Sequence, residues 1–383
     1  PAFGDSWPSM MGAIGMTYEQ GGGHGVAIVL EQGDGTVLSL RQRAHGHFTT
    51  SIATLKTTAE KRQERLTDFL AFFRHALSLG EKEVKAYALV PATDPHNADG
   101  LADLLVRNGI EVQRAEAAFR ARVNGGYGLE PAPASYNFPA GTYLVEAGQP
   151  KGVAVQMLLE PQPTLEDTSF YDLSGWALPL IHNVEAYTLG EVPRVDRSPV
   201  TGLPERTGAV GAGEAVWGYA IPYEGPSALL AAHCLLNHDV EVHSASEAFT
   251  LGGREYPAGT FTIPRYRNPE DLGEIVARIA GEHGVTAFPL ETGLVEEGDD
   301  LGAGSHRQLE KPRVAILTGG SYGQTWHFFD QRYPTFDYTL IDAGSLGRTD
   351  LSDYNALILT GGLDEQETEA VRTWLQGGGV LLA

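Results

Sequence analysis

The sequence predicts an α/β fold spread over several domains, and three observations support this. The chain has 383 residues, and at roughly 100–200 residues per domain this length suggests two to four domains. Residues 84–160 and 218–283 share short matches in the same order, which indicates two duplicated α/β modules. From Lys311 onward, apolar strand-like segments alternate with helical ones, as in a parallel sheet with helices on its faces.

The composition is that of a folded protein with an acidic surface. Hydrophobic residues make up 42% and charged residues 20% of the chain, and the formal net charge is −22. This charge disfavours nucleic acid and anionic lipid as partners, because both favour basic surfaces. No run reaches the roughly 18 apolar residues that a membrane span needs. We therefore expect no nucleic-acid partner and no membrane span, while the oligomeric state stays open.

Residues 1–82 form the first predicted segment. Apolar patterns predict strands at 12–19, 25–30 and 36–40. A long helix is expected from 49 to 79. Its apolar positions follow helical spacing at Leu66, Phe69, Leu70, Phe73 and Leu77.

The two modules are predicted at 83–165 and 216–295. The clearest match pairs Phe138-Pro-Ala-Gly-Thr-Tyr143 with Tyr256-Pro-Ala-Gly-Thr-Phe261. Pro-Ala-Gly is typical of a tight turn, because Pro fixes φ and Gly accepts a positive φ. Each module is expected to run strand, helix, strand, turn, strand, helix. Residues 166–215 are predicted to be a connecting segment and linker between the modules.

The opening residues resemble a known family. Gly4-Asp-Ser-Trp-Pro8, followed by Gly12-Ala-Ile-Gly-Met-Thr-Tyr-Glu-Gln-Gly-Gly22, resembles the end of the catalytic domain in carboxypeptidase A-like zinc metallopeptidases. The likeness covers roughly residues 1–80 and is greatest to large bacterial members with extra C-terminal domains. It implies that Glu19 is the catalytic base at the end of a core strand, and that the long helix is the last helix of that domain.

The resemblance also implies a chemistry. Zinc lowers the pKa of a bound water toward about 7, and a nearby carboxylate takes the proton and returns it to the departing amine. The expected substrate is a peptide, cut at its C-terminal peptide bond. The family's zinc ligands, a His-x-x-Glu pair and a later His, would fall before Pro1. We therefore expect zinc in an intact parent protein, no metal-binding residue in this chain, and no activity from the chain alone. Both ends read as cuts within a larger protein, and the resemblance implies an extracytoplasmic location.

Three further features carry a weaker chemical interpretation. His182-Asn-Val-Glu185 spells His-x-x-Glu but follows Glu19, the wrong order for the family, so a structural histidine is expected. His45 and His47, two residues apart near a strand exit, are expected to be solvated rather than to chelate a metal. The single cysteine, Cys234, excludes an internal disulfide, and its apolar helical surroundings favour a buried, inert thiol over a nucleophile.

The last segment, 305–383, is similar to the class I glutamine amidotransferase-like domain, which has a flavodoxin-type fold. The likeness rests on Arg313-Val-Ala-Ile-Leu317 with its Gly-rich turn, and on Leu357-Ile-Leu-Thr-Gly-Gly362. In amidotransferases the nucleophilic cysteine follows the strand that begins here at Val380, and would lie beyond Ala383. We expect a noncatalytic copy, and Gly319-Gly320-Ser321 gives only a weak indication of an anion site.

Two rival hypotheses remain beside the peptidase. In the first, the duplicated modules and the last segment bind a ligand or partner, and residues 1–80 are scaffold. In the second, which is less favoured, the chain belongs to a working amidotransferase. A pocket shared by both repeats, with convergent polar groups, would favour the first rival, whereas a flat interface between the repeats would weaken it.

Overall fold

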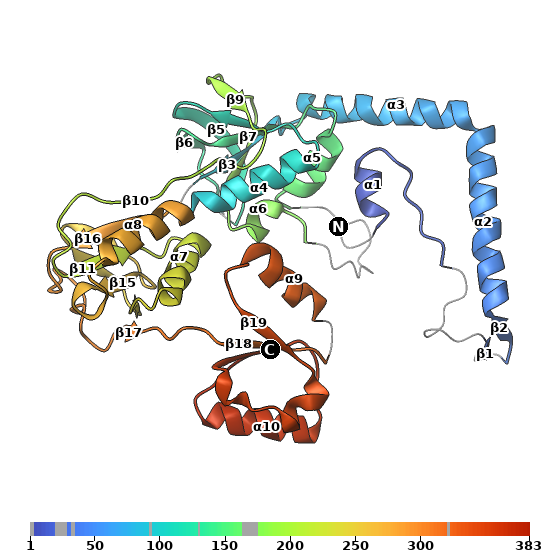
Figure 1. The fold of residues 1–383 in the computed structure, drawn as a ribbon. Coiled ribbons are helices and arrows are strands. Elements are labelled where there is room, and N and C mark those ends of the chain that lie inside the picture. The colour runs from blue at the N-terminus through green and yellow to red at the C-terminus, as the bar shows by residue number, and fades with distance from the viewer. Residues whose placement is uncertain are drawn as a thin grey trace. The chain divides into compact units, whose positions relative to one another are not determined.

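The computed structural model describes residues 4–19, 29–31, 35–91, 94–128, 131–162, 175–319 and 322–383 (Figure 1). These residues form helices together with antiparallel, mixed and parallel sheets, so the predicted multidomain α/β class is confirmed. The chain divides into two compact units, Pro1–Pro204 and Glu205–Ala383. The first unit holds the N-terminal region and the first module, and the second holds the second module and the last segment.

The N-terminal region consists of exposed helices and one small hairpin. Its elements are α1 (Ser6–Met10), β1 (Val29–Glu31), β2 (Val37–Ser39), α2 (Leu40–Glu60), α3 (Arg62–Ser78) and the 3-10 turn η1 (Leu79–Glu81). Ser39 starts α2 with a capping box, because its hydroxyl accepts from the Gln42 N–H while the Gln42 side chain accepts from the Ser39 N–H. None of the described side chains of α2 is buried. This long helix therefore gains its stability from capping and local contacts rather than from a core.

Two predictions for this region are wrong. Residues 12–19 form no strand, because among the described residues none pairs with their backbone, and a strand needs a neighbour for its ladder. The helix predicted from 49 to 79 starts earlier and is broken at Lys61, whose φ of −101° and ψ of 23° leave helical geometry. Figure 1 shows α2 and α3 running in different directions on either side of this break. The strand at 36–40 is confirmed as β2, and most of 25–30 lies outside the described residues.

The first module is a sheet with helices on one face and a hairpin on the other. Its strands lie in the order β6-β5-β8-β3-β7-β4-β9. Their bounds are β3 (Ala86–Val90), β4 (Gln113–Ala115), β5 (Phe119–Gly126), β6 (Ser135–Phe138), β7 (Tyr143–Glu146), β8 (Glu185–Leu189) and β9 (Arg197–Pro199). Helices α4 (Pro95–Arg107) and α5 (Gly152–Leu159) share a core with Leu89 and Val145, and the short α6 (Leu178–Ile181) follows. The β5–β6 hairpin shares the opposite core with Ala88.

The second module repeats this plan. Its sheet order is β10-β16-β11-β15-β12-β17, in which β16-β11-β15-β12-β17 corresponds to β8-β3-β7-β4-β9. Its elements are β10 (Ala209–Val210), β11 (Gly218–Ile221), α7 (Pro226–Asn237), β12 (His243–Ala245), β13 (Phe249–Leu251), β14 (Arg254–Tyr256), β15 (Phe261–Pro264), η2 (Arg265–Arg267), α8 (Leu272–His283), β16 (Thr286–Leu290) and β17 (His306–Gln308). Here α7 and α8 pack on one face, while the β13–β14 hairpin packs on the other. The two modules thus have equivalent topology.

The equivalence extends to individual hydrogen bonds in the Pro-Ala-Gly turn. Gly141 has a φ of +89° and donates its N–H to Ala115 O at 2.8 Å. Its counterpart Gly259 has a φ of +91° and donates to Ala245 O at 2.7 Å. The hairpin rings also match: Phe119 stacks on Phe138 at 4.9 Å, and Phe249 on Tyr256 at 4.8 Å. The turn chemistry expected of this segment is therefore present in both copies.

The module boundaries differ from those predicted. Strands β8 and β9 lie within 166–215, which we expected to be a linker, yet they pair with β3 and β4. Likewise β17 lies within 305–383 but pairs with β12 of the second module. The three-residue strands β9 (Arg-Ser-Pro) and β17 (His-Arg-Gln) carry little strand propensity of their own, so their pairing partners determine them.

The last segment forms a four-stranded parallel sheet in the order β19-β18-β20-β21. Its elements are β18 (Val314–Leu317), α9 (Gly323–Arg332), β19 (Tyr338–Ile341), η3 (Ala343–Arg348), η4 (Leu351–Asp353), β20 (Ala356–Leu359), α10 (Glu365–Gln376) and β21 (Val380–Leu382). The chain-order pattern 2-1-3-4 is that of a flavodoxin-like sheet. Ala315 and Leu357 of the central strands pack with Val371 of α10 in one core.

Candidate functional site

Glu19 lies in the irregular, exposed segment that follows α1. This segment is tied to its neighbours by two side-chain hydrogen bonds, from Thr17 Oγ1 to Asp5 Oδ2 and between Tyr18 Oη and Thr54 Oγ1, both 2.9 Å long. Among the described residues, none bonds to the Glu19 carboxylate. The structure therefore places Glu19 as an exposed carboxylate instead of at the end of a core strand.

An apolar groove of about 750 Å³ runs beside this segment. Ile14, Met16 and Tyr18 form one wall, and residues of α2 and α3, including Phe69 and Phe72, form the other. Ile14 is 57% exposed and Met16 50% exposed. Apolar side chains at every second position, exposed to solvent and next to Glu19, are unusual on a surface that no other part of a protein covers.

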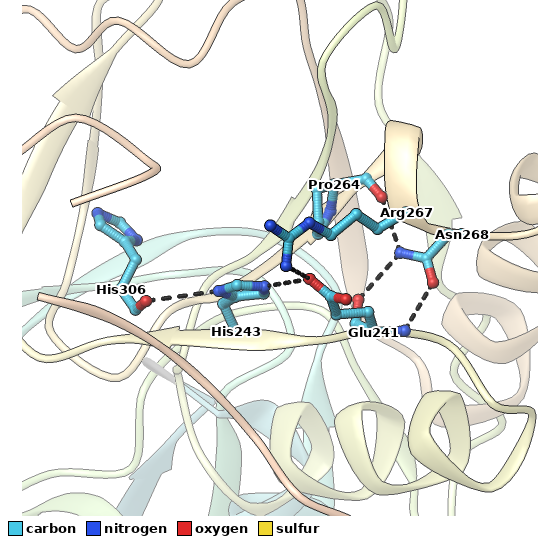
Figure 2. A network of polar contacts seen from close by, with 6 residues as sticks. All are labelled: Glu241, His243, Pro264, Arg267, Asn268 and His306. Atoms are coloured by element: carbon cyan, nitrogen blue, oxygen red, sulfur yellow. Dashed lines mark hydrogen bonds and ion pairs between the residues drawn. The ribbon is translucent and has the colours of Figure 1, made fainter. Parts of the chain in front are cut away.

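A polar network in the second module joins Glu241 to the side chains of three residues, His243, Arg267 and Asn268 (Figure 2). Glu241 Oε1 lies 2.7 Å from His243 Nε2 and 3.2 Å from Arg267 Nη1. The other ring nitrogen of His243 lies 3.4 Å from the backbone oxygen of His306. Asn268 accepts the Glu241 N–H at 2.6 Å and donates to the backbone oxygens of Glu241 and Pro264 at 3.0 and 2.7 Å.

Comparison with the first module shows which part of this network belongs to the shared fold and which part is specific to the second module. There Gln149 accepts the Glu111 N–H at 2.7 Å and donates to the backbone oxygens of Glu111 and Glu146 at 3.1 and 2.8 Å. The amide clamp thus recurs in both copies. The strand register places Gln113 where the second module has His243, and no arginine precedes Gln149 in its loop. Because each of its side chains already has a partner, the Glu241 network is an ion-pair cluster rather than a set of free catalytic groups.

A second cavity, of about 970 Å³, lies in the first module. The chain between α3 and β3 contributes Lys82 and Glu83, β3 contributes Tyr87, and the end of α5 is followed by Glu160. Strand β5 borders the cavity where its pairing with β8 shifts register between Val123 and Gly125. Sequence reasoning missed this site, because its lining comes from several separate segments that no local pattern connects.

The remaining sequence candidates are not brought together. His182 is the C-cap residue directly after α6, and Glu185 begins β8, where its carboxylate accepts a 2.7 Å hydrogen bond from the Tyr187 hydroxyl. His45 and His47 lie within α2 rather than at a strand exit, and two residues apart they face different directions. Within the described part of the chain, no group of three His, Cys, Asp or Glu side chains could hold a metal ion.

Cys234 is half-buried in α7, with its Sγ 3.2 Å from His283 Nε2. Burial, with Glu282 nearby, raises the pKa of the Cys234 thiol, which opposes the thiolate that a nucleophile needs. Of the suggested anion-binding turn, Gly320 and Ser321 lie outside the described residues.

Comparisons with protein-family models, with curated proteins and with solved structures found no match to this chain. Among its described helices, none combines the length and apolar character needed to cross a membrane.

Proposed function

We propose that this chain is part of a zinc-dependent metallocarboxypeptidase that hydrolyses C-terminal peptide bonds, with Glu19 as the general base. The observation that carries the proposal is the segment Gly4-Asp-Ser-Trp-Pro8 with Thr17-Tyr-Glu19, followed by long helices. In this proposal, zinc is held by residues of the parent protein outside this chain. The modules and the last segment support the catalytic domain without acting in catalysis.

The exposed surface of residues 4–78 supports the proposal. Besides the groove wall formed by Ile14 and Met16, this region exposes large apolar side chains along both long helices, namely Phe48, Ile52, Leu55, Leu66, Phe69, Leu70 and Leu77. An exposed apolar area spread over helices and an unpaired segment is typical of a surface that another part of a protein covers. The remainder of a catalytic domain would cover it, and its sheet would give residues 12–19 the backbone partners that a strand needs.

The chemistry of Glu19 is consistent with this role. A general base must be ionised and within hydrogen-bond reach of the water that it deprotonates. Glu19 has no described side chain competing for its oxygens, so a zinc-bound water could be its partner. A bound zinc would acidify the water, and Glu19 would take one proton from that water and pass it to the leaving amine.

The test uses the protein with the polypeptide that its gene encodes before Pro1. Release of the C-terminal amino acid from a blocked dipeptide is measured before and after treatment with a chelator, and again after zinc is added back. The proposal expects activity that the chelator removes and zinc restores. Activity that survives complete removal of metal, or no peptide hydrolysis from a metal-loaded folded protein, would contradict it.

A further inference from the structure

The cavity in the first module is lined by charged groups of both signs. Lys82 supplies an ammonium group, while Glu83 and Glu160 supply two carboxylates. Among the described residues, none forms an ion pair or a side-chain hydrogen bond with any of these three groups. Lys82 and Glu83 are exposed and Glu160 is partly buried, so water solvates these charges, and a ligand that enters the concave site meets all three.

Tyr87 adds a hydrogen-bond donor to the cavity wall. Its side chain is only 3% exposed, yet it lines the cavity, and its hydroxyl has no hydrogen-bond partner among the described residues. The hydroxyl oxygen is not among the described side-chain atoms that are cut off from solvent without a partner, so water reaches it from the cavity and a ligand can replace that water. Burial and the Glu160 carboxylate raise the pKa of Tyr87 to about 12, so the hydroxyl stays protonated and can donate.

The β5 bulge opens the cavity on its other side. The register shift between Val123 and Gly125 takes Asn124 out of the ladder, and Asn124 Nδ2 donates instead to Glu83 O at 3.1 Å. This bond fixes the backbone of Glu83 at the rim. Gly125 and Gly126 also line the cavity and add no side chain to fill it. The volume of about 970 Å³ is within the usual range for small-molecule sites.

We propose that this cavity binds a small zwitterion with an excess of positive charge, of the class of a basic amino acid or a short basic peptide. Glu160 and Glu83 accept hydrogen bonds from ammonium groups of the ligand, while Lys82 and the Tyr87 hydroxyl donate to its carboxylate. One lysine against two glutamates leaves the site with a net charge of −1, so a ligand with a net charge of +1 neutralises it. None of these residues belongs to the segment from Gly4 to Glu19 on which the peptidase proposal rests. The binding proposal can therefore be tested independently of the peptidase proposal.

Isothermal titration calorimetry of the 383-residue chain tests the proposal with dipeptide probes. Glycyl-lysine carries the required charges, glycyl-glutamate reverses the net charge, and glycyl-lysine amide lacks the carboxylate. We expect saturable binding of glycyl-lysine and at least tenfold weaker binding of glycyl-glutamate. Glu160→Gln should lower the affinity for glycyl-lysine by roughly tenfold, as expected when a charge-assisted hydrogen bond is lost. Lys82→Met should remove the preference for the free carboxylate over the amide.

Two further variants separate binding from folding. Tyr87→Phe keeps the buried ring and removes only the hydroxyl. It should therefore weaken binding of glycyl-lysine more than binding of glycyl-lysine amide. Glu116→Gln changes an exposed carboxylate of the same module outside the cavity, and should leave affinity unchanged. The proposal is overturned if glycyl-lysine shows no saturable heat at millimolar concentration. Equal affinity for glycyl-glutamate, or an unchanged affinity in a folded Glu160→Gln protein, would overturn it as well.

Discussion

The amide clamp that recurs in both modules makes a quantitative prediction about stability. Asn268 forms three hydrogen bonds to backbone groups of Glu241 and Pro264, and Gln149 forms three to Glu111 and Glu146. Each amide ties the chain entering one strand to the end of its neighbour. Replacement by alanine removes all three bonds at once.

The expected loss follows from these bonds. A hydrogen bond contributes about 1 kcal/mol net, and a buried backbone group left without a partner costs about 1–3 kcal/mol. Gln149→Ala, at a site only 3% exposed, should therefore lower the free energy of unfolding by about 3–4 kcal/mol. Asn268→Ala should cost about 3 kcal/mol, because its site is more open and water can replace part of the bonding.

Urea unfolding followed by circular dichroism and tryptophan fluorescence measures both losses. Asn137→Ala is the matched control, because this amide is exposed on β6, and its loss should cost less than about 0.5 kcal/mol. If Gln149→Ala and Asn268→Ala cost no more than the control, the clamp is incidental and the argument from the repeat fails.

Two further predictions concern the second unit. Gly218 has a φ of +156°, and an added Cβ would lie 1.9 Å from Ile263 O, so Gly218→Ala should cost more than about 3 kcal/mol. Gly281→Ala, in α8 with open space around it, should be neutral or stabilising by up to about 1 kcal/mol in the same urea titration. Burial lowers the pKa of His306 below its usual 6.5. Just below pH 6.5, His306 is therefore neutral in the folded unit but protonated in the unfolded chain. The free energy of unfolding should thus fall as the pH drops through about 6.5. Urea titrations at several pH values should show a smaller decrease in the free energy of unfolding for His306→Gln. The exposed control His327→Gln should show the same decrease as the unsubstituted protein.

Sequence reasoning succeeded where local patterns carry the information. The buried run at β18 and the Pro-Ala-Gly turn each depend on neighbouring residues, and both are present. The parallel sheet of the last segment followed from the same kind of pattern.

Sequence reasoning failed where a strand or a site depends on pairing between residues that are far apart in the sequence. The apolar alternation of residues 12–19 suits a strand, but a strand also needs a neighbouring backbone, which no described residue provides. Strands β9 and β17 exist through their partners β4 and β12. The clamp at Asn268 and the cavity beside Tyr87 also depend on residues far apart in the chain, so no motif indicated them.

The central claim, that Glu19 is the general base of a zinc peptidase, is tested most directly by Glu19→Gln in the protein carrying its upstream polypeptide. Peptide turnover and zinc content are measured together, with Glu31→Gln as a nearby exposed control. We predict that Glu19→Gln lowers kcat by about 10²–10⁴-fold while zinc stays bound, and that Glu31→Gln leaves both unchanged. A Glu19→Gln protein that keeps its zinc and its full turnover would contradict the assignment.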